Sequence, residues 1–262
     1  MDKKDGKQNE TFNQNETAMK KLTLRILLTA AALVTLGGGM ALTPKASART
    51  LLWSDEFNGT SVNTKNWSIY DNKADGSDSW FLARNLTVSG GTLKIANKEE
   101  SYNGRHWSGG GLECIANHPQ YCYLEARVRI TPANCYDWST WWTIGWKNNA
   151  SVWPPEFDIC EFQGGPGKSP GQSYHWTSSN YDTKSTGKDE SQWHTYGVYW
   201  TATSSPQFYV DGVKSFKSGG TASVAAMAAK MKLSSSPNSM NRFSGCTLGV
   251  MEVDYVRVYD TP

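Results

Sequence analysis

The chain has 262 residues and a mass of 29.0 kDa, which allows one large domain or two small ones. Its formal net charge is +2, from 26 basic and 24 acidic side chains. Without the first 48 residues, which are treated below as a leader, 19 basic and 20 acidic side chains remain and the net charge is −1. A near-neutral domain has no basic stripe for nucleic acid and no polybasic patch for a membrane surface. It also lacks a strong overall field for a sulfated polyanion, although a local patch could still bind one.

The first 48 residues have the pattern of an export signal. Residues 1–18 are polar, residues 19–21 (Met-Lys-Lys) begin a basic segment, and residues 26–36 are apolar. Residues 46–48 (Ala-Ser-Ala) match the small-x-small site of signal peptidase. We therefore expect residues 1–48 to be a leader and secretory signal peptide, and the mature protein to be extracellular or periplasmic without membrane contact. An uncleaved membrane anchor is the alternative, although the apolar stretch is short for a span.

Residues 49–262 are predicted to form one all-β domain. Short runs of β-branched and aromatic residues alternate with turn residues, without an internal repeat or a linker. Ser89-Gly90-Gly91 and Asp211-Gly212 each predict a hairpin turn between two such runs. The helical candidate is the Ala- and Met-rich segment Ala222–Met231. All twelve tryptophans lie in this domain, and their large rings either fill a core or line a groove.

Export permits disulfides, but five cysteines leave at least one unpaired. Cys114 and Cys122 flank a predicted turn and could face each other across a hairpin. Cys135 and Cys246 are too far apart in sequence for their pairing to be decided. We interpret Cys160 as a small buried side chain rather than a nucleophile. No Cys or His spacing in the sequence resembles a zinc site.

The run Glu156-Phe157-Asp158-Ile159-Cys160-Glu161 carries three acids among apolar residues. Alternate side chains of a strand share a face, so Glu156 and Asp158 lie together while Glu161 would point to the apolar side. A β-bulge near Ile159-Cys160 would bring all three carboxyls to one face. Neighbouring carboxyls raise one another's pKa, and glycoside hydrolysis uses this to pair a protonated acid with an ionised carboxylate. The alternative is an ordinary solvated face of an antiparallel sheet.

Aromatic side chains accompany the acid run. Trp153 lies three residues before it and is expected at the edge of a cleft, as a stacking platform for sugar. Alternation places Trp142 and Trp146 on one face of the preceding strand and Trp141 on the other, so part of this group belongs to the core. A histidine on the strand that follows the acids could hydrogen-bond a substrate hydroxyl. The candidates for substrate contact are therefore Trp138, Trp142, Trp153 and His175.

With these motifs the sequence resembles glycoside hydrolase family sixteen, the family of laminarinases, lichenases, agarases and carrageenases. The resemblance covers nearly all of residues 51–259. It implies an all-β fold, a concanavalin-like β-jelly-roll sandwich of two curved antiparallel sheets with a concave substrate cleft. It rests on segments that follow in the family's order: Trp53–Phe57, Tyr123–Arg127, Glu156–Glu161, Trp193–Tyr196, Phe208–Gly212 and Val253–Tyr259.

The resemblance also implies roles for the three acids. Glu156 would be the nucleophile, and Glu161 the general acid and then the general base. Asp158 would hydrogen-bond the nucleophile and help to set the two pKa values apart. The expected reaction is endo-acting hydrolysis of a β-linked polysaccharide with retention at the anomeric carbon. No cofactor is required for it, and we expect a monomer whose partner is the polysaccharide.

The substrate stays open, because Pro155 and Cys160 stand where glucan-cleaving members often have Gly and Met. Both β-glucans and algal galactans of the agar, porphyran and carrageenan types are therefore candidates. A non-catalytic carbohydrate-binding jelly roll and a transglycosylase with the same covalent intermediate are the alternatives to a hydrolase.

Two further groups of residues are candidate ligand sites. Arg84, Arg105 and His106 could form a sulfate pocket or be ordinary surface groups. Asp55, Glu56 and Asp254 resemble positions where some members of the family hold a structural calcium, an ion that prefers oxygen ligands.

Overall fold

The computed structural model describes residues 49–75, 78–118, 121–131, 137–164, 168–200, 205–220, 228–237 and 247–262. The expected signal peptide, Cys135 and Cys246 lie outside these residues, so what the sequence suggests about them stays a prediction. None of the described segments forms a helix with the length and hydropathy of a membrane span.

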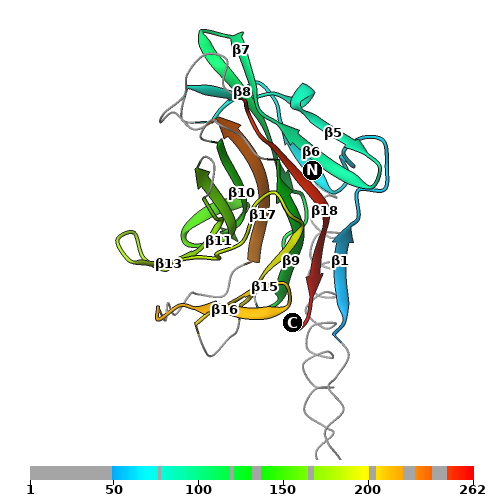
Figure 1. The fold of residues 1–262 in the computed structure, drawn as a ribbon. Helices are drawn as coiled ribbons and strands as arrows, with labels where there is room; N and C mark the ends of the chain where they lie inside the picture. The colour runs from blue at the N-terminus through cyan, green and yellow to red at the C-terminus, as the bar shows by residue number, and fades with distance from the viewer. Residues whose placement is uncertain are drawn as a thin grey trace, which may run out of the picture. The chain divides into compact units, whose positions relative to one another are not determined.

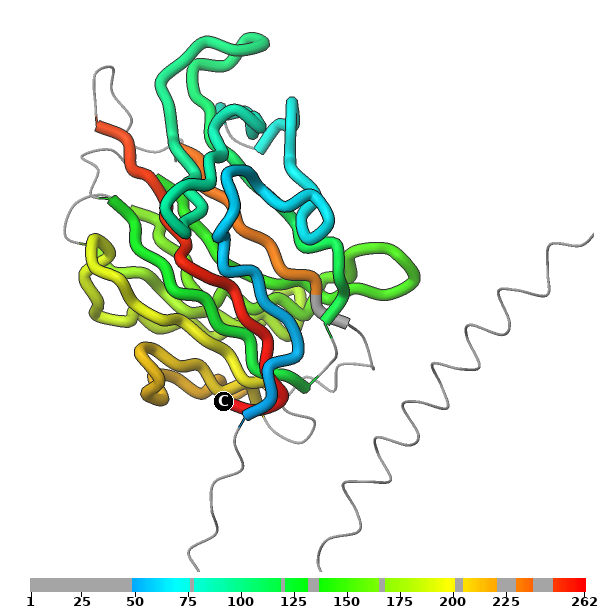
Figure 2. Tube along the Cα trace, turned by 90° about the vertical axis from the view of Figure 1, so that its right-hand side faces the viewer, coloured from blue at the N-terminus to red at the C-terminus, as the bar shows by residue number. Residues whose placement is uncertain are grey.

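One sheet has eight strands, and it contains the first and the last strand of the domain (Figure 1). The strands are β1 (Leu51–Asp55), β5 (Leu86–Ser89), β6 (Thr92–Ala96), β9 (Tyr123–Ile130), β14 (His194–Tyr199), β15 (Gln207–Val210), β16 (Val213–Lys217) and β18 (Val250–Tyr259). Their order is β16-β15-β14-β9-β18-β6-β5, and β1 also pairs with β18. Figure 2 shows β1 in blue and β18 in red side by side.

The other sheet has ten strands. They are β2 (Trp67–Tyr70), β3 (Lys73–Ala74), β4 (Ser79–Phe81), β7 (Lys98–Tyr102), β8 (Arg105–Cys114), β10 (Asp137–Lys147), β11 (Ala150–Gly164), β12 (Gly171–His175), β13 (Tyr181–Ser185) and β17 (Ala228–Pro237). The order is β13-β12-β11-β10-β17-β8-β4-β3, and β2 and β7 also pair with β8. The pairing of β4 with β8 is parallel, in a sheet expected to be purely antiparallel. A short 3₁₀ turn, Ala83–Asn85, is the helical element of the described residues.

A single large hydrophobic core lies between the two sheets. Alternate residues of the strands supply it, since each strand turns every second side chain inward. The core includes Leu124, Val128 and Val256 from the eight-stranded sheet and Leu112, Trp141 and Phe157 from the ten-stranded sheet, all almost fully buried. Burial of each such side chain contributes roughly 1.5–3 kcal/mol. The predicted all-β sandwich is confirmed.

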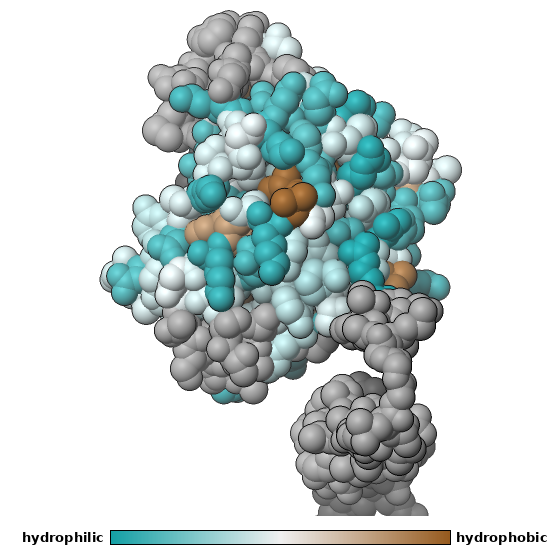
Figure 3. All heavy atoms as spheres, turned by 60° about the horizontal axis from the view of Figure 1, so that its bottom comes forward, coloured by the Kyte–Doolittle hydropathy of each residue, from teal (hydrophilic) through white to brown (hydrophobic). Residues whose placement is uncertain are grey.

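Both predicted hairpins are confirmed. Gly90 and Gly91 join β5 to β6 with φ values of 61° and 72°. Asp211 and Gly212 join β15 to β16 with φ values of 52° and 73°. Two-residue hairpin turns favour positive φ at both positions, which explains the residue types found there. The surface seen in Figure 3 is mostly hydrophilic, with isolated hydrophobic residues, as is usual for the solvent side of a sandwich.

The helix expected over Ala222–Met231 is wrong in its described part. Residues 228–231 belong to β17, and residues 222–227 lie outside the described residues. β17 is hydrogen-bonded to β10 on one side and to β8 on the other. Residues 228–231 pair with β10 and Lys232–Ser235 also pair with β8, and this pairing outweighs the helix propensity of alanine and methionine.

The disulfide considered between Cys114 and Cys122 is also wrong. Both thiols are free and buried. Cys114 ends β8 and Cys122 immediately precedes β9, and these strands belong to different sheets instead of one hairpin. Burial raises the pKa of both thiols to about 12, so they stay protonated. Cys160 is fully buried, as expected for a small core residue.

Candidate active site

A β-bulge in β11 sets the direction of the acidic side chains. Trp141 and Trp142 of β10 pair with Cys160 and Asp158, so Ile159 has no partner across the ladder. The ladder with β12 shifts over the same stretch, between Asp158 and Glu161. The predicted bulge is therefore confirmed. Its extra residue lets both Ile159 and Cys160 be fully buried while the acids turn outward.

All three acids border one hollow of about 430 Å³. It lies on the face of the ten-stranded sheet that is turned away from the core, because the side chains that line it alternate with core residues. The lining residues are Tyr70, Lys73, Ala74, Asp75, Phe81, Trp138, Thr140, Trp142, Glu156, Asp158, Glu161, Lys232, Ser234 and Ser236. A hollow of this size that combines aromatic rings with convergent polar groups has the composition of a ligand site.

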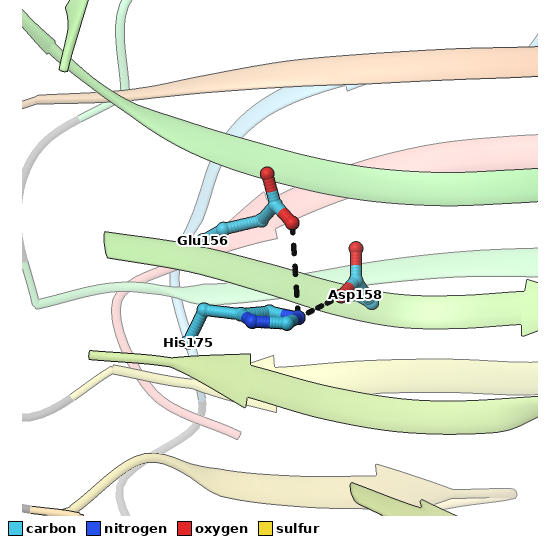
Figure 4. A group of neighbouring side chains, drawn as sticks. All are labelled: Glu156, Asp158 and His175. Atoms are coloured by element: carbon cyan, nitrogen blue, oxygen red, sulfur yellow. Dashed lines mark ion pairs between the residues drawn. The ribbon is translucent and has the colours of Figure 1, made fainter. Parts of the chain in front are cut away.

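Glu156 and Asp158 of β11 face His175, which lies on the neighbouring strand β12 (Figure 4). The His175 Nε2 atom lies 3.2 Å from Asp158 Oδ2 and 3.8 Å from Glu156 Oε1. The hydrogen bond to Asp158 raises the pKa of His175 above its ordinary value. Burial, followed by the negative charge of Asp158, raises the pKa of Glu156 to about 7, and the charge of His175 opposes that rise.

Glu161 has neutral donors as its hydrogen-bond partners. Its Oε1 atom accepts hydrogen bonds from Trp138 Nε1 at 2.9 Å and from Gln163 Nε2 at 2.6 Å. Burial and the charge of Asp158 raise the pKa of Glu161, while these two donors oppose the rise. The acids are thus held in different surroundings, with a titratable base beside Glu156 and two neutral donors on Glu161.

The tryptophans divide as alternation predicts. Trp141 is fully buried in the core, whereas Trp138 and Trp142 border the hollow. Trp153 is 47% exposed, and its ring centroid lies 6.4 Å from that of His175. Trp153 therefore stands beside the acids but is not among the residues that line the hollow, in keeping with a position at its edge.

Several lining residues were not singled out from the sequence, among them Tyr70, Lys73 and Lys232. Lys232 lies directly across from Trp142 in the ladder of β10 and β17. Tyr70 and Lys73 come from β2 and β3, which lie on the other side of β17 from the acid-bearing strand β11 in the order of the sheet. The sequence signal for Lys232 was the alternation of Lys, Lys, Ser and Ser with Met and Leu along residues 230–236, a strand pattern that overlaps only the end of the predicted helix Ala222–Met231.

The residues suggested for a sulfate pocket lie elsewhere and have other partners. Arg84 is 2.8 Å from Glu100, and Arg105 donates to the Ser79 carbonyl at 2.7 Å and is 3.5 Å from Asp75. Neither arginine nor His106 lines the hollow.

The acids suggested for calcium are bonded to protein groups. Asp55 accepts hydrogen bonds from Asn66 and Trp67, Glu56 forms a two-point pair with Arg257, and Asp254 pairs with Arg127. Among the described residues, the one group of three His, Cys, Asp or Glu ligand atoms within 4.8 Å is Glu156, Asp158 and His175. The three suggested acids therefore do not form a ligand group of their own, and a structural calcium stays a prediction.

Comparison with known proteins assigns the chain to a family. Residues 51–261 match the family model described as "Beta-porphyranase A-D, GH16 domain". The clotting factor G alpha subunit of Tachypleus tridentatus is 26% identical over 80% of this chain and 34% of its own length. β-Porphyranase B of Zobellia galactanivorans is 24% identical over 61% of this chain and 64% of its own length. The chain thus spans about one third to two thirds of these curated relatives.

Solved structures agree on the fold. A non-specific endo-β-1,3(4)-glucanase superposes with a TM-score of 0.69 at 24% identity, covering 81% of this chain and 95% of that one. LamA of Zobellia galactanivorans, solved in complex with laminaritriose and laminaritetraose, superposes with a TM-score of 0.68 at 22% identity, covering 80% of this chain and 98% of that one. With the match of the family model over most of the chain, these findings show that the protein belongs to glycoside hydrolase family sixteen.

Proposed function

We propose that the protein is a secreted, endo-acting glycoside hydrolase that cleaves a β-linked polysaccharide with retention, by double displacement. The observation that carries this proposal is the bulge at Ile159, which gives Glu156, Asp158 and Glu161 a common hollow. Two carboxyl groups beside one sugar bond are what this chemistry requires. An open hollow does not need a chain end, which supports cleavage within the polymer.

In the first step, a Glu156 oxygen attacks the anomeric carbon as the bond to the leaving oxygen breaks. Glu161 donates its proton to that oxygen, so the departing sugar leaves as an alcohol. In the second step, Glu161 takes a proton from water, and the water oxygen displaces Glu156 from the anomeric carbon. Two inversions give net retention.

The surroundings of the two glutamates support this division of roles. His175 contacts Glu156 and Asp158 directly, and its raised pKa favours the positive form, which stabilises an ionised Glu156. Glu161 is buried beside the charge of Asp158, which favours its protonated form. Because the acids interact, the group titrates together, and ionisation of Glu156 with retention of the proton on Glu161 is the arrangement that the chemistry uses. Asp158 acts by orienting His175 and by raising the pKa of both glutamates.

The side chains bordering the acids suit a sugar polymer. Trp142 and the exposed Trp153 offer aromatic surface for the C–H faces of sugar rings, and Trp138 positions Glu161 through its indole N–H. His175 is close enough to the acids to contact a hydroxyl group next to the scissile bond. The relatives include β-porphyranase B and two endo-1,3-1,4-β-glycanases of Rhizobium meliloti, so β-galactans and β-glucans both belong in a substrate screen.

Azide rescue tests the two roles separately. Glu156→Ala, given an aryl β-oligosaccharide with a good leaving group, should form a glycosyl azide of inverted configuration. Glu161→Ala with the same donor should form an azide of retained configuration, because its covalent intermediate still forms. Exchange of these two products would reverse the roles, and absence of both would contradict the proposal.

The natural substrate is found by measuring reducing ends released from laminarin, lichenan, agarose, porphyran and carrageenan. Release of short oligosaccharides of mixed length at early times is expected for endo action. N-terminal sequencing of the exported protein, expected to begin at Arg49, checks the proposed secretion.

A further inference from the structure

The orientation of the His175 ring is fixed at one of its two nitrogens. The Nε2 atom lies 3.2 Å from Asp158 Oδ2 and 3.8 Å from Glu156 Oε1, whereas the Nδ1 atom has no hydrogen-bond partner among the described residues. In many sites a hydrogen bond to the second nitrogen sets the direction of the first. Because the outer torsion of a histidine side chain is only weakly restricted, another contact is needed here to keep Nε2 directed at the acids.

Tyr181 supplies a contact of this kind. Glu156, His175 and Tyr181 are register partners on β11, β12 and β13, so their side chains are neighbours on one face of the sheet. The rings of Tyr181 and His175 are stacked, with centroids 5.0 Å apart and planes inclined by 21°. The ring of Trp153 is farther from His175, at 6.4 Å, and is tilted by 44°. A stacked ring restrains the plane of the imidazole and leaves Nε2 available to the acids.

The strand that carries Tyr181 is held at both of its sides. In the described part of the sheet β13 is an edge strand, which pairs with β12. On its other side, Asp182 Oδ2 accepts hydrogen bonds from Ser218 Oγ at 2.8 Å and from the Gly219 N–H group at 2.7 Å. Ser218 and Gly219 directly follow β16 of the other sheet. The backbone of Tyr181 therefore has a fixed place beside His175.

Packing alone does not account for the side chain of Tyr181. It is 57% exposed, it belongs to no part of the hydrophobic core, and it does not line the hollow. Its hydroxyl group has no hydrogen-bond partner in the part of the chain that the structure describes. The ring contact that it makes there is the one with His175. Tyr181 is thus linked to the acids through a single residue.

We propose that Tyr181 is a positioning residue of the candidate active site, whose ring holds the imidazole of His175 in the plane where Nε2 meets Asp158 and Glu156. This inference rests on the proposed function and deepens it, by adding a residue that lies outside the hollow. An imidazole held in this way keeps its place beside the nucleophile as the sugar binds, without reorientation.

Replacement of the ring tests the proposal by kinetics. Tyr181→Leu should lower kcat about two- to tenfold, the scale of one aromatic contact, with little change in KM. The acidic limb of the kcat/KM profile should move to higher pH, because the charge of His175 lowers the pKa of Glu156 and would be less well placed. Tyr181→Phe keeps the ring and should restore both values. Tyr121→Leu removes a tyrosine that is 42% exposed and precedes β9 of the other sheet, and this control should match wild type.

Nuclear magnetic resonance of the His175 ring reads its position without turnover. The chain has four histidines, and His175→Gln assigns the signal of His175. In Tyr181→Leu the titration midpoint of this signal should fall, because the hydrogen bond to Asp158 raises the pKa of His175 and the charges of Asp158, Glu156 and Glu161 act in the same direction. The ring-current shift from the stacked tyrosine should also be lost. Tyr181→Phe should keep both.

Unchanged kcat, pH profile and His175 titration in Tyr181→Leu would overturn the proposal. A rise of KM on long oligosaccharides, with kcat and the pH profile unchanged, would also overturn it and assign the ring to direct contact with sugar. If Tyr181→Leu does not fold, Tyr181→Thr makes the same test with a residue that favours strands. If the wild type cleaves no β-glycan, the proposed function fails, while the titration of His175 still tests the role of Tyr181.

Discussion

Acidic side chains on the two sheets differ in the partners that surround them. On the eight-stranded sheet, Glu252 is almost fully buried and contacts both Arg129 and Lys94. Both cations are its register partners on the adjacent strands β9 and β6. Near the end of the same strand, Arg257 forms a two-point pair with Glu56, 2.8 and 2.9 Å long. Both of these acids therefore have a cation as a direct partner.

On the ten-stranded sheet, three acids crowd together in β11 without a lysine or arginine partner among the described residues. The ion-pair partner that they have among these residues is His175, and the charge of Lys232 also acts on Glu156. Like charges that are buried together without such partners destabilise the ionised form, and folding alone would not select this arrangement. The comparison indicates that Glu252 and Glu56 stabilise the fold, whereas the three acids of β11 are available for the proposed chemistry.

The largest expected effect is a loss of activity without a loss of stability. Glu161→Gln keeps the shape of the side chain but removes the transferable proton, so kcat should fall by about 10²- to 10⁴-fold. The free energy of unfolding should stay the same or rise, because a source of repulsion with Asp158 is lost. Kinetics on a natural polysaccharide and urea denaturation measure the two quantities. Retention of most of the activity would contradict the role of Glu161.

The converse variant should lose stability and keep its activity. Glu252→Gln removes a buried negative charge from between Arg129 and Lys94, and we expect a loss of about 1–3 kcal/mol in the free energy of unfolding. The kcat of the folded fraction should be unchanged, since Glu252 lies on the other sheet. Urea denaturation gives the first value and active-site-normalised kinetics the second. A variant as stable as wild type would show that the comparison of the sheets is too simple.

The smallest effect is a dependence of stability on pH that has opposite signs on the two sheets. The pKa of Glu156 is raised from 4.5 to about 7, so between these values the folded protein keeps a proton that the unfolded chain has lost. Stability from this group is present below about pH 4.5 and is lost as the pH rises through about 7, on the order of 1–3 kcal/mol. The hydrogen bond to Arg257 lowers the pKa of Glu56, so that contribution is present above the ordinary pKa and is lost as the pH falls.

Glu156→Gln should therefore reduce the decline of stability between pH 4.5 and 7, with the part from Glu161 left in place, and thermal denaturation at a series of pH values measures this. Arg257→Gln is the opposite control, because it should weaken stability near neutrality and leave the decline in place. An unchanged profile in Glu156→Gln would mean that the protonation of this residue is the same in the folded and unfolded chain.

The three acids of the candidate site could be predicted from the sequence more completely than the residues around them. The bulge followed from a conflict of phase within one strand, since Glu156 and Glu161 cannot share a face of a regular strand while Phe157 and Phe162 share the other. Local alternation was enough to resolve it. Lys232 was missed because its strand pairs with β8 and β10, which are far away in the sequence, although residues 230–236 alternate as a strand does. Lys73 lies on a strand of two residues, too short to show any periodicity. The wrong disulfide had the same cause, as sequence distance did not show that β8 and β9 belong to different sheets.

The single unpaired residue in β11 has a consequence for the changes of length that this strand tolerates. Removing Ile159 alone would leave the order Glu-Phe-Asp-Cys-Glu-Phe, in which strict alternation still puts all three acids on one face and Phe162 on the other. A bulged strand of six residues and a regular strand of five thus give the acids the same direction. The loss or gain of one apolar residue could therefore interconvert the two forms without loss of either glutamate.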